Sequence, residues 1–123
     1  MFTAALAVPG KVYHHILMSE FVQITTSTGT RDNADRIALE LVERRLAACV
    51  QIAGPIASTF RWQGKVETAE EWLCIAKSEK GQLGAIEKLL AELHPYEVPE
   101  LIATPIVGGG AAYLKWLGEQ LQS

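Results

Sequence analysis

Residues Ala47–Glu79, AACVQIAGPIASTFRWQGKVETAEEWLCIAKSE, have the pattern of one long β-hairpin. The turn falls at Gln63-Gly64, where glycine supplies the positive φ that a two-residue turn needs. In the first arm, Gly54-Pro55 marks a bend, because proline lacks a donor for the strand ladder and glycine favours a bulge. We therefore predict that strand pairing changes at this bend.

The predicted hairpin is long for the domain that carries it. If Ala47–Trp62 is mostly extended, this arm spans roughly 50 Å at about 3.3 Å per residue. A globule of about 100 residues has a diameter of only roughly 35 Å. The hairpin is therefore predicted to extend past its own domain. Because an unpaired apolar strand end in water promotes aggregation, we expect other copies of the chain to cover it.

The composition is that of one ordinary globular domain. The chain has 123 residues, of which 49% are hydrophobic and 20% charged, so it is long enough to bury a core. Its net charge of −3 and its pI near 5.6 leave no basic face. This balance argues against a nucleic-acid partner.

The two cysteines, Cys49 and Cys74, lie on opposite arms of the hairpin. In a regular hairpin they are four residues apart along the ladder, roughly 13 Å, which is too far for a disulfide. A one-residue bulge at Gly54 would instead place them on opposite faces of the sheet. Both alternatives predict two buried, reduced thiols, which is typical of a cytoplasmic protein.

The segments on either side of the hairpin predict two more strands and three helices. A helix capped by Thr30 or Asp32 follows the first strand, and the residue before Pro95 ends the second helix. The inward positions of the first helix recur at helical spacing: Ala34, Ile37, Ala38, Leu41, Val42 and Leu46. The other elements are a strand at Phe21–Thr26, a helix from Gly81-Gln82 to His94, a strand at Leu101–Val107 and a helix at Ala111–Leu121.

This order of elements predicts an α+β fold. A βαββαβ string folds most simply as a ferredoxin-like, four-stranded antiparallel sheet with both helices on one face. Right-handed crossovers then place the first and third strands at the centre, and the nearly all-apolar Trp72–Ala76 suits a central strand. The long central hairpin and the C-terminal helix are additions to this arrangement.

The first 18 residues differ from the rest and are interpreted as an N-terminal extension, with the compact domain at residues 19–123. The apolar run Phe2–Val8 has no basic residues before it and is too short to span a membrane, so no membrane partner is expected. His14-His15 is a poor metal clip, because adjacent residues of an extended chain point in opposite directions.

Four blocks of the sequence, in order, resemble the CutA family of divalent-cation-tolerance proteins over about Phe21–Leu121. The blocks are Leu46-Ala47-Ala48-Cys49; Trp62-Gln63-Gly64-Lys65 with Glu67, Glu71 and Lys77 beyond it; His94-Pro95-Tyr96-Glu97-Val98-Pro99-Glu100; and Tyr113-Leu114-Lys115-Trp116-Leu117. The resemblance implies a compact cytoplasmic homotrimer of ferredoxin-like subunits, joined through the hairpins and connected with tolerance to divalent metal ions, copper among them.

The candidate site is a polar cleft between subunits. His94 is the candidate metal ligand, and Lys77, Tyr96, Glu100 and Glu71 are the candidate ligand-binding residues. Carboxylates and one imidazole are expected to hold a divalent ion weakly, or the lysine to anchor an anion. The alternative for His94 is a structural place against the last carbonyls of its helix.

The copper site of the family is incomplete in this sequence. Copper-binding members resemble one another in a cysteine of the first strand and two adjacent histidines before Pro-Tyr. Here the corresponding positions are Thr25, Leu93 and His94. A thiolate and an imidazole are missing, so a tight copper site is not expected.

No pattern predicts an enzyme. The three histidines do not assemble with a nucleophile and an acid, and two of them lie in the N-terminal extension. We therefore predict a non-enzymatic trimer that binds a divalent metal, copper, weakly. The alternative is a trimeric signalling module similar to the PII proteins, which binds a small anionic effector in the intersubunit cleft.

Overall fold

The computed structural model describes residues 20–123 and confirms the predicted order of elements. The predicted N-terminal extension, with Phe2–Val8 and His14-His15, lies outside the described residues. The elements are β1 (Phe21–Thr28), α2 (Arg31–Glu43), β2 (Cys49–Trp62), β3 (Lys65–Glu79), a short 3-10 turn (Lys80–Gln82), α3 (Leu83–Leu93), β4 (Ile102–Pro105) and α4 (Ala111–Gln120).

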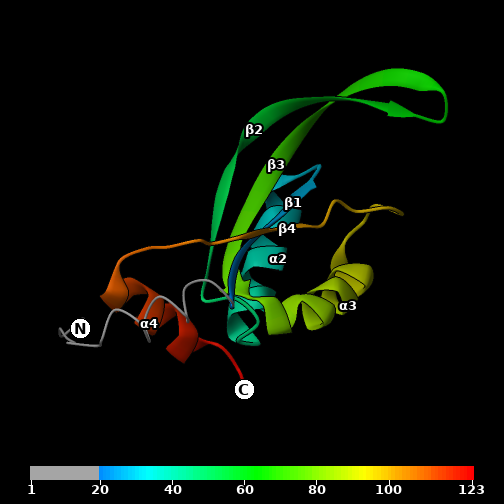
Figure 1. Ribbon diagram of the computed structural model, residues 1–123. Helices are drawn as coiled ribbons and strands as arrows, with labels where there is room; N and C mark the ends of the chain where they lie inside the picture. The colour runs from blue at the N-terminus through cyan, green and yellow to red at the C-terminus, as the bar shows by residue number, and fades with distance from the viewer. Residues whose placement is uncertain (1–19) are drawn as a thin grey trace.

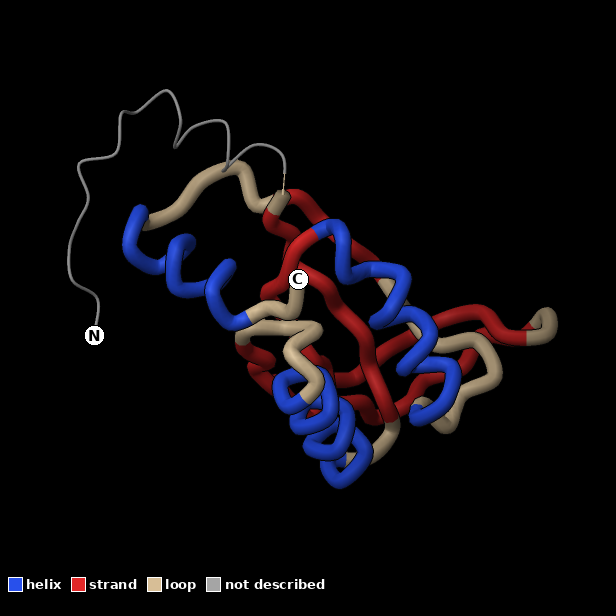
Figure 2. Tube along the Cα trace, turned by 90° about the horizontal axis from the view of Figure 1, so that it is seen from below, coloured by secondary structure: helices blue, strands red, loops and turns tan. Residues whose placement is uncertain are grey.

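The four strands form one antiparallel sheet in the order β2-β3-β1-β4, so the first and third strands are central, as predicted. Helices α2 and α3 lie along the sheet, whereas α4 lies apart from them near one end (Figures 1 and 2). The ferredoxin-like α+β prediction is confirmed.

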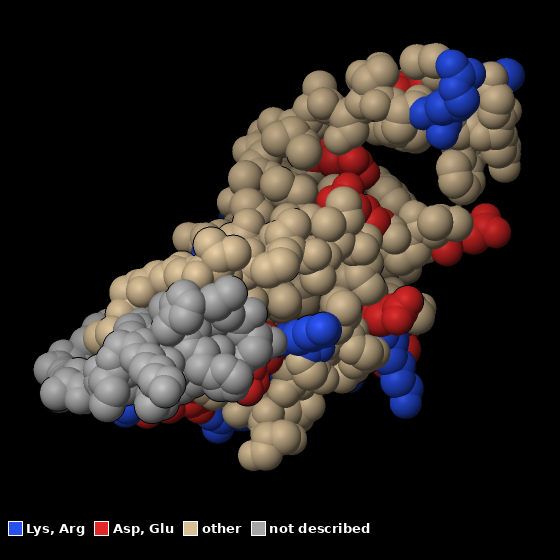
Figure 3. All heavy atoms as spheres, in the orientation of Figure 1, with Lys and Arg blue, Asp and Glu red and all other residues tan. Residues whose placement is uncertain are grey.

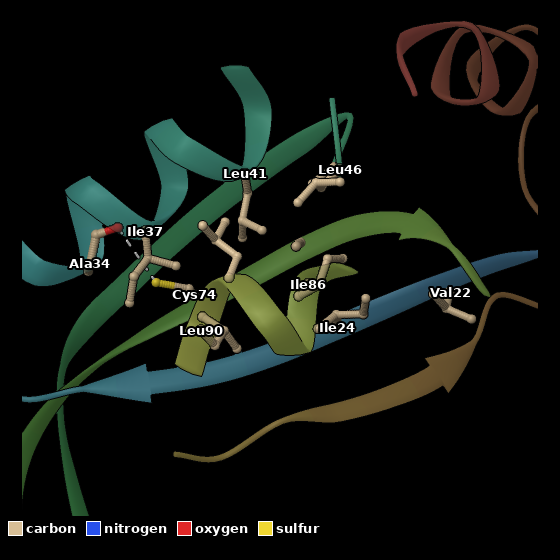
Figure 4. Close-up of a cluster of buried hydrophobic side chains, with 12 residues drawn as sticks. Val22, Ile24, Ala34, Ile37, Leu41, Leu46, Cys74, Ile86 and Leu90 are labelled. Atoms are coloured by element: carbon tan, nitrogen blue, oxygen red, sulfur yellow. Dashed lines mark hydrogen bonds between the residues drawn. The ribbon is translucent and has the colours of Figure 1, made fainter. Parts of the chain in front are cut away.

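The main core lies between the sheet and these two helices (Figure 4). Ile37 of α2, Ile86 of α3 and Cys74 of β3 are each at most 1% exposed. Figure 4 shows their side chains pointing into one cluster with those of Leu41, Leu90 and Ile24. A second, smaller cluster joins α4 to the end of the sheet through Phe21, Ala48, Leu114, Leu117 and Leu121.

The hairpin has the predicted turn and the predicted change of pairing. Gln63 and Gly64 both have positive φ, 50° and 79°, as a two-residue turn requires. Pairing shifts between Ala53 and Ile56, which is the one-residue bulge foreseen at Gly54-Pro55. As a result Cys49 pairs with Lys77 and Cys74 with Ile52, which places the two thiols on opposite faces of the sheet.

Three details differ from the sequence-based expectations. Strand β1 continues past Thr26 to Thr28, because Thr28 still pairs with Trp72. Strand β4 covers only Ile102–Pro105, because it pairs with no more than Val22–Thr25 of β1. Val42 was expected to face inward and is 41% exposed, since α2 ends one residue later at the rim of the core.

The structure confirms the predicted N-cap of α2 and the two free thiols. The burial predicted for both thiols holds for only one of them. Thr30 is the N-cap of α2, and its side chain accepts a hydrogen bond from the Asn33 backbone N–H at 3.1 Å. Both cysteines are free, and Cys74 is buried as expected. Cys49 is only half-buried, because it faces the side of the sheet opposite α2 and α3.

Candidate functional site

The predicted site residues lie on or beside the sheet face that α2 and α3 leave open. Cys74 and Ala76 of β3 belong to the core beneath these helices. Because side chains alternate along a strand, Leu73, Ile75 and Lys77 point the other way. They are all half-buried, so this face of the described chain is neither fully covered nor fully solvated.

Glu71 and Tyr96 meet where the hairpin leaves the sheet. Glu71 is only 7% exposed, and its Oε2 accepts a hydrogen bond from the Tyr96 hydroxyl at 2.8 Å. Burial first, and then the bond to Glu71 and its charge, raise the pKa of Tyr96 from 10.0 to about 12. The phenol is therefore a neutral donor at ordinary pH, and Glu71 has a fixed partner.

His94 is held by both of its ring nitrogens. Its Nδ1 accepts a hydrogen bond from the Tyr96 backbone N–H at 3.1 Å, and its Nε2 lies 2.8 Å from the Ser27 carbonyl oxygen. Since a carbonyl oxygen only accepts, Nε2 carries the proton in this neutral tautomer. The His94 and Tyr96 rings also lie in contact, with centroids 4.8 Å apart. A metal at His94 would have to replace one of these two bonds.

Glu100 lies on the same open face of the sheet as Glu71. Within one chain, Lys77 lies far from Glu71, Tyr96 and His94. Glu100 Oε2 accepts a hydrogen bond from the Thr25 hydroxyl at 3.4 Å. Lys77 Nζ donates to Gln51 Oε1 at 2.6 Å. Lys77 and Glu71 are six residues apart on one strand, which is about 20 Å. The structure therefore brings Glu71, Tyr96 and His94 together and leaves Lys77 at the other end of the face.

The described residues do not fit a metal centre in a single chain. No group of three or more His, Cys, Asp or Glu side chains within residues 20–123 is placed to hold an ion. At the two positions where a thiolate and an imidazole were missing from the sequence pattern, Thr25 bonds to Glu100 and Leu93 packs against the core. Neither side chain supplies the soft donor that copper prefers.

The far end of the open face carries a second tyrosine contact. The Tyr113 hydroxyl of α4 lies 3.6 Å from Cys49 Sγ. Burial first, and then the interaction with Cys49, raise the pKa of Tyr113 from 10.0 to about 12.

The buried Cys74 thiol on the opposite face has a pKa raised from 9.0 to about 11, first by burial and then by the charge of Asp35. Cys74 therefore stays a protonated core residue.

Two residues of the site were missed by sequence reasoning. The Ser27 carbonyl accepts from His94, and a backbone carbonyl carries no sequence signal. Gly29 was not singled out from the sequence, yet a Cβ there would lie 3.3 Å from the Tyr96 hydroxyl. Glycine at this position therefore leaves room for the tyrosine that reaches Glu71.

The charges on the described surface are separated along the hairpin. Figure 3 shows basic side chains at the hairpin tip, where Arg61 and Lys65 flank the turn. Acidic side chains lie nearer the sheet, on the part of β3 that contains Glu67, Glu70 and Glu71. Within residues 20–123, no helix has the length and apolar character needed to cross a membrane.

Comparison with known proteins gives a consistent family match. The sequence model described as "CutA1 divalent ion tolerance protein" matches residues 22–120. The "Divalent-cation tolerance protein CutA" of Thermus thermophilus is 42% identical over 102 residues, covering 83% of this chain and 97% of that protein. A "Protein CutA homolog" of Xenopus laevis is 39% identical over 103 residues, covering 84% of this chain and 66% of that protein.

A solved structure shares the fold closely. The crystal structure of a CutA1 described as a stable protein, from the psychrotrophic bacterium Shewanella sp. SIB1, superposes with a TM-score of 0.82 at 42% identity. The superposition covers 86% of this chain and 99% of that one. The match therefore includes the long hairpin as well as the sheet and helices.

Proposed function

This chain belongs to the CutA1 divalent ion tolerance family, and on that premise we propose that it is a homotrimeric, non-catalytic protein of divalent-metal tolerance that binds copper weakly. The family membership supplies the role in metal tolerance.

The observation that carries the proposed assembly is the exposed outer arm of the hairpin, defined here as Ile56–Trp62 and Lys65–Glu70. Large apolar side chains of this arm are open to solvent in one chain: Ile56 36%, Phe60 41%, Trp62 40% and Val66 65% exposed. Ile56, Phe60 and Trp62 lie on one face of the arm, whereas Val66 pairs with Arg61 on the other face. Exposed apolar side chains that gather on one face mark an interaction surface. A closed ring of copies is the arrangement that covers every arm without growing into a filament.

The proposed metal binding is weak and shared between copies. One chain offers carboxylates at Glu71 and Glu100 but no set of three donors within residues 20–123. Glu71 is buried without an ion pair, because its described partner is the neutral Tyr96 phenol. A second copy at this face would add the donors that one chain lacks. Carboxylate-rich donor sets hold copper less tightly than thiolate and imidazole sets.

Calorimetry with Cu(II) and Zn(II) tests the metal proposal. The natural chain is expected to bind Cu(II) weakly. The double variant Thr25→Cys with Leu93→His restores a thiol and an imidazole, and it is expected to bind Cu(II) at least tenfold more tightly. The matched control Thr104→Cys adds a thiol to the neighbouring strand on the same face and is expected to leave the affinity nearly unchanged. Equal affinities for the double variant and the natural chain would contradict the placement of the site.

Lys77 favours a second candidate function, the binding of a small anionic effector by a PII-like trimer. Among residues 20–123 the Lys77 ammonium has no carboxylate partner and bonds only to the Gln51 side chain. A half-buried ammonium with three donors and no carboxylate partner has donors left to bind an anion. A saturable calorimetric signal with a nucleotide, lost in Lys77→Gln and accompanied by no Cu(II) or Zn(II) signal, would favour this second function.

Two further features support the proposed non-catalytic, cytoplasmic role. Residues 20–123 contain one histidine, His94. Both of its ring nitrogens are occupied by structural hydrogen bonds. It is therefore not poised as a general base beside a nucleophile. The two free cysteines support a reducing compartment such as the cytoplasm.

A further inference from the structure

We propose that the end of the open sheet face beside α4, called the Lys77 corner, binds a small carboxylate ligand, whose carboxylate lies between the Lys77 ammonium and the Tyr113 hydroxyl. The corner consists of Lys77, Gln23, Gln51 and Cys49 on the sheet and Tyr113 on α4. This site deepens the second candidate function, on which it rests for the role of Lys77 in holding an anion. It is independent of the proposed metal.

Three strands bring the sheet side of the corner together. Lys77 of β3 is paired with Cys49 of β2 on one side and with Gln23 of β1 on the other. Side chains of directly paired positions share one face, with Cβ atoms about 5 Å apart. Gln51 lies two residues along β2 on the same face, and its Oε1 accepts a hydrogen bond from the Lys77 ammonium at 2.6 Å. The ammonium is therefore surrounded by two carboxamides and a thiol, none of which is a carboxylate.

Helix α4 brings a hydroxyl to this corner. The buried side of the helix packs on Phe21 and Ala48, at the end of the sheet where β2 begins (Figure 1). Tyr113 of α4 lies with its hydroxyl 3.6 Å from Cys49 Sγ, and Cys49 is the paired neighbour of Lys77. Because the pKa of Tyr113 is raised to about 12, its hydroxyl keeps its proton at ordinary pH and is available as a donor.

The two ends of the open face differ in one group. At the far end, the Tyr96 hydroxyl donates to the Glu71 carboxylate at 2.8 Å. At the Lys77 corner, the hydrogen-bonding neighbour of the Tyr113 hydroxyl within residues 20–123 is the Cys49 sulfur, which is a weak acceptor. A phenol and an ammonium thus lie close together without a carboxylate between them. A ligand carboxylate would accept from both.

The charges near Lys77 favour a ligand with a single negative charge. Lys77 is half-buried, and none of the ion pairs within residues 20–123 includes it. Glu79 lies two residues further along the strand on the same face, and its pKa is raised by burial and then by the charge of Glu20. These two carboxyl groups repel a phosphate dianion more strongly than a monoanion. A carboxylate therefore fits this place better than a phosphate.

Apolar surface adjoins the two donors. Ile75 precedes Lys77 by two residues on the same face and is half-buried, and Tyr113 is 39% exposed. The Tyr113 ring also lies beside the Trp116 ring, with centroids 5.6 Å apart. A compact apolar body attached to the carboxylate would bury part of this surface, which favours binding. Benzoate combines the two features and is the probe used in the test.

Calorimetry on the full chain compares three related probes. Benzoate is expected to give a saturable signal. Benzamide lacks the charge, and phenyl phosphate is largely a dianion above neutral pH. Both are expected to bind at least about tenfold more weakly than benzoate, because charge-assisted hydrogen bonds are the strong ones and the dianion is repelled by Glu79.

Three variants assign the benzoate signal to residues. Lys77→Gln removes the ammonium and is expected to weaken benzoate binding by about tenfold or more. Tyr113→Phe removes one neutral donor and is expected to weaken it by about threefold. The matched control Lys115→Gln removes a lysine of α4 that is paired with Glu119, and it is expected to leave the affinity unchanged.

Cys49 reports where the probe binds. This thiol is half-buried in the corner, whereas Cys74 is 1% exposed in the core. Benzoate is expected to slow the alkylation of Cys49 by iodoacetamide at least about threefold in the natural protein and to have no effect in Lys77→Gln. Mass spectrometry of the two cysteine peptides measures this, and Cys74 is expected to stay unmodified throughout.

Four results would overturn the carboxylate site. They are the absence of a saturable benzoate signal, benzamide that binds as tightly as benzoate, equal benzoate affinities in Lys77→Gln and Lys115→Gln, and a Cys49 thiol that does not react in the assembled protein. A smaller particle in light scattering of Lys77→Gln would also overturn it, since Lys77 would then belong to a contact between copies.

The test separates this site from the function on which it rests. A nucleotide signal that is lost in Lys77→Gln, without any benzoate signal, would overturn the carboxylate site and leave the second candidate function standing. Benzoate binding that depends on Lys77 and shields Cys49 supports the site.

Discussion

The two strands of the hairpin have opposite surroundings on the two sides of Gly54. On the inner side, β3 pairs with β1 as well as β2, and its Cys74 and Ala76 are 1% and 2% exposed beneath the helices. On the outer side the same strands pair only with each other, and Val66 is 65% exposed. Regular hydrogen bonding is thus continuous along most of the ladder, but burial is not. A β-ladder satisfies the backbone without covering its side chains, so the outer arm needs a surface that one chain lacks.

The largest expected effect lies on the inner side. Ile86 of α3 is fully buried in the core, so Ile86→Ala is expected to lower the free energy of unfolding by about 2–5 kcal/mol. The control Leu39→Ala truncates an exposed side chain of α2 and is expected to change it by less than about 0.5 kcal/mol. Urea unfolding measures both. Equal losses for the two variants would break the distinction between covered and open apolar positions.

The joint between the two regions is the next most sensitive position. A Cβ at Gly54 would lie 2.6 Å from the Trp72 ring and 3.1 Å from the Glu71 carbonyl oxygen, so Gly54→Ala is expected to cost about 1–3 kcal/mol of stability. The matched control is Gly84→Ala in α3, where a Cβ meets nothing within 4 Å. Alanine favours a helix, so this control is expected to stabilise by up to about 1 kcal/mol. Thermal unfolding of both variants would sharpen the comparison, and a harmless Gly54→Ala would contradict the packing at the joint.

The smallest expected effect is a loss of stability at alkaline pH. The pKa of Tyr96 is raised from 10.0 to about 12 in the folded chain. Between these values the unfolded chain has lost the phenolic proton that the folded chain keeps, so the unfolded state binds fewer protons and stability falls as pH rises. The effect disappears well below pH 10, where the phenol is protonated in both states. Urea midpoints across this range are expected to decline less in Tyr96→Phe than in the natural protein.

Tyr113, at the other end of the sheet, serves as a control for the raised pKa of Tyr96. Its pKa is raised by burial and by Cys49 in place of a carboxylate. Glu71→Gln is expected to bring the pKa of Tyr96 closer to its ordinary value and to leave that of Tyr113 unchanged. Absorbance titration of the phenolates follows both groups, and an unchanged pKa of Tyr96 in Glu71→Gln would contradict the assigned hydrogen bond.

Most of the fold was predictable because it follows from local pattern and turn chemistry. Gly64 has the positive φ that was predicted for it, and Gly54-Pro55 coincides with the register shift. The residues that were misjudged lie at element ends, where neighbours decide the outcome. Thr28 remains in β1 because Trp72 pairs with it, and Val42 is exposed because α2 ends beside it.

The candidate site was predictable only in part. Glu71, Tyr96, Glu100, Lys77 and His94 were selected through the family resemblance, and the structure joins three of them by hydrogen bonds. Strand spacing alone separates Lys77 from Glu71 by about 20 Å on one strand, so these two residues of one chain do not share a single site. The Ser27 carbonyl and the space above Gly29 have no sequence signature, because they are properties of the folded backbone.

The central claim is that other copies of the chain cover the outer arm, and light scattering tests it most directly. Two variants extend the measurement on the natural protein. Trp62→Asp places a charge on the arm, whereas the control Leu39→Asp places one on an exposed apolar position of α2. The control is expected to keep the size of the natural particle.

At low micromolar concentration the natural protein is expected to show about three times the chain mass of 13.4 kDa. Trp62→Asp is expected to lower the particle size and the stability of the fold together, because assembly and folding share the same burial. A well-folded monomer, either of the natural protein or of Trp62→Asp, would contradict the account.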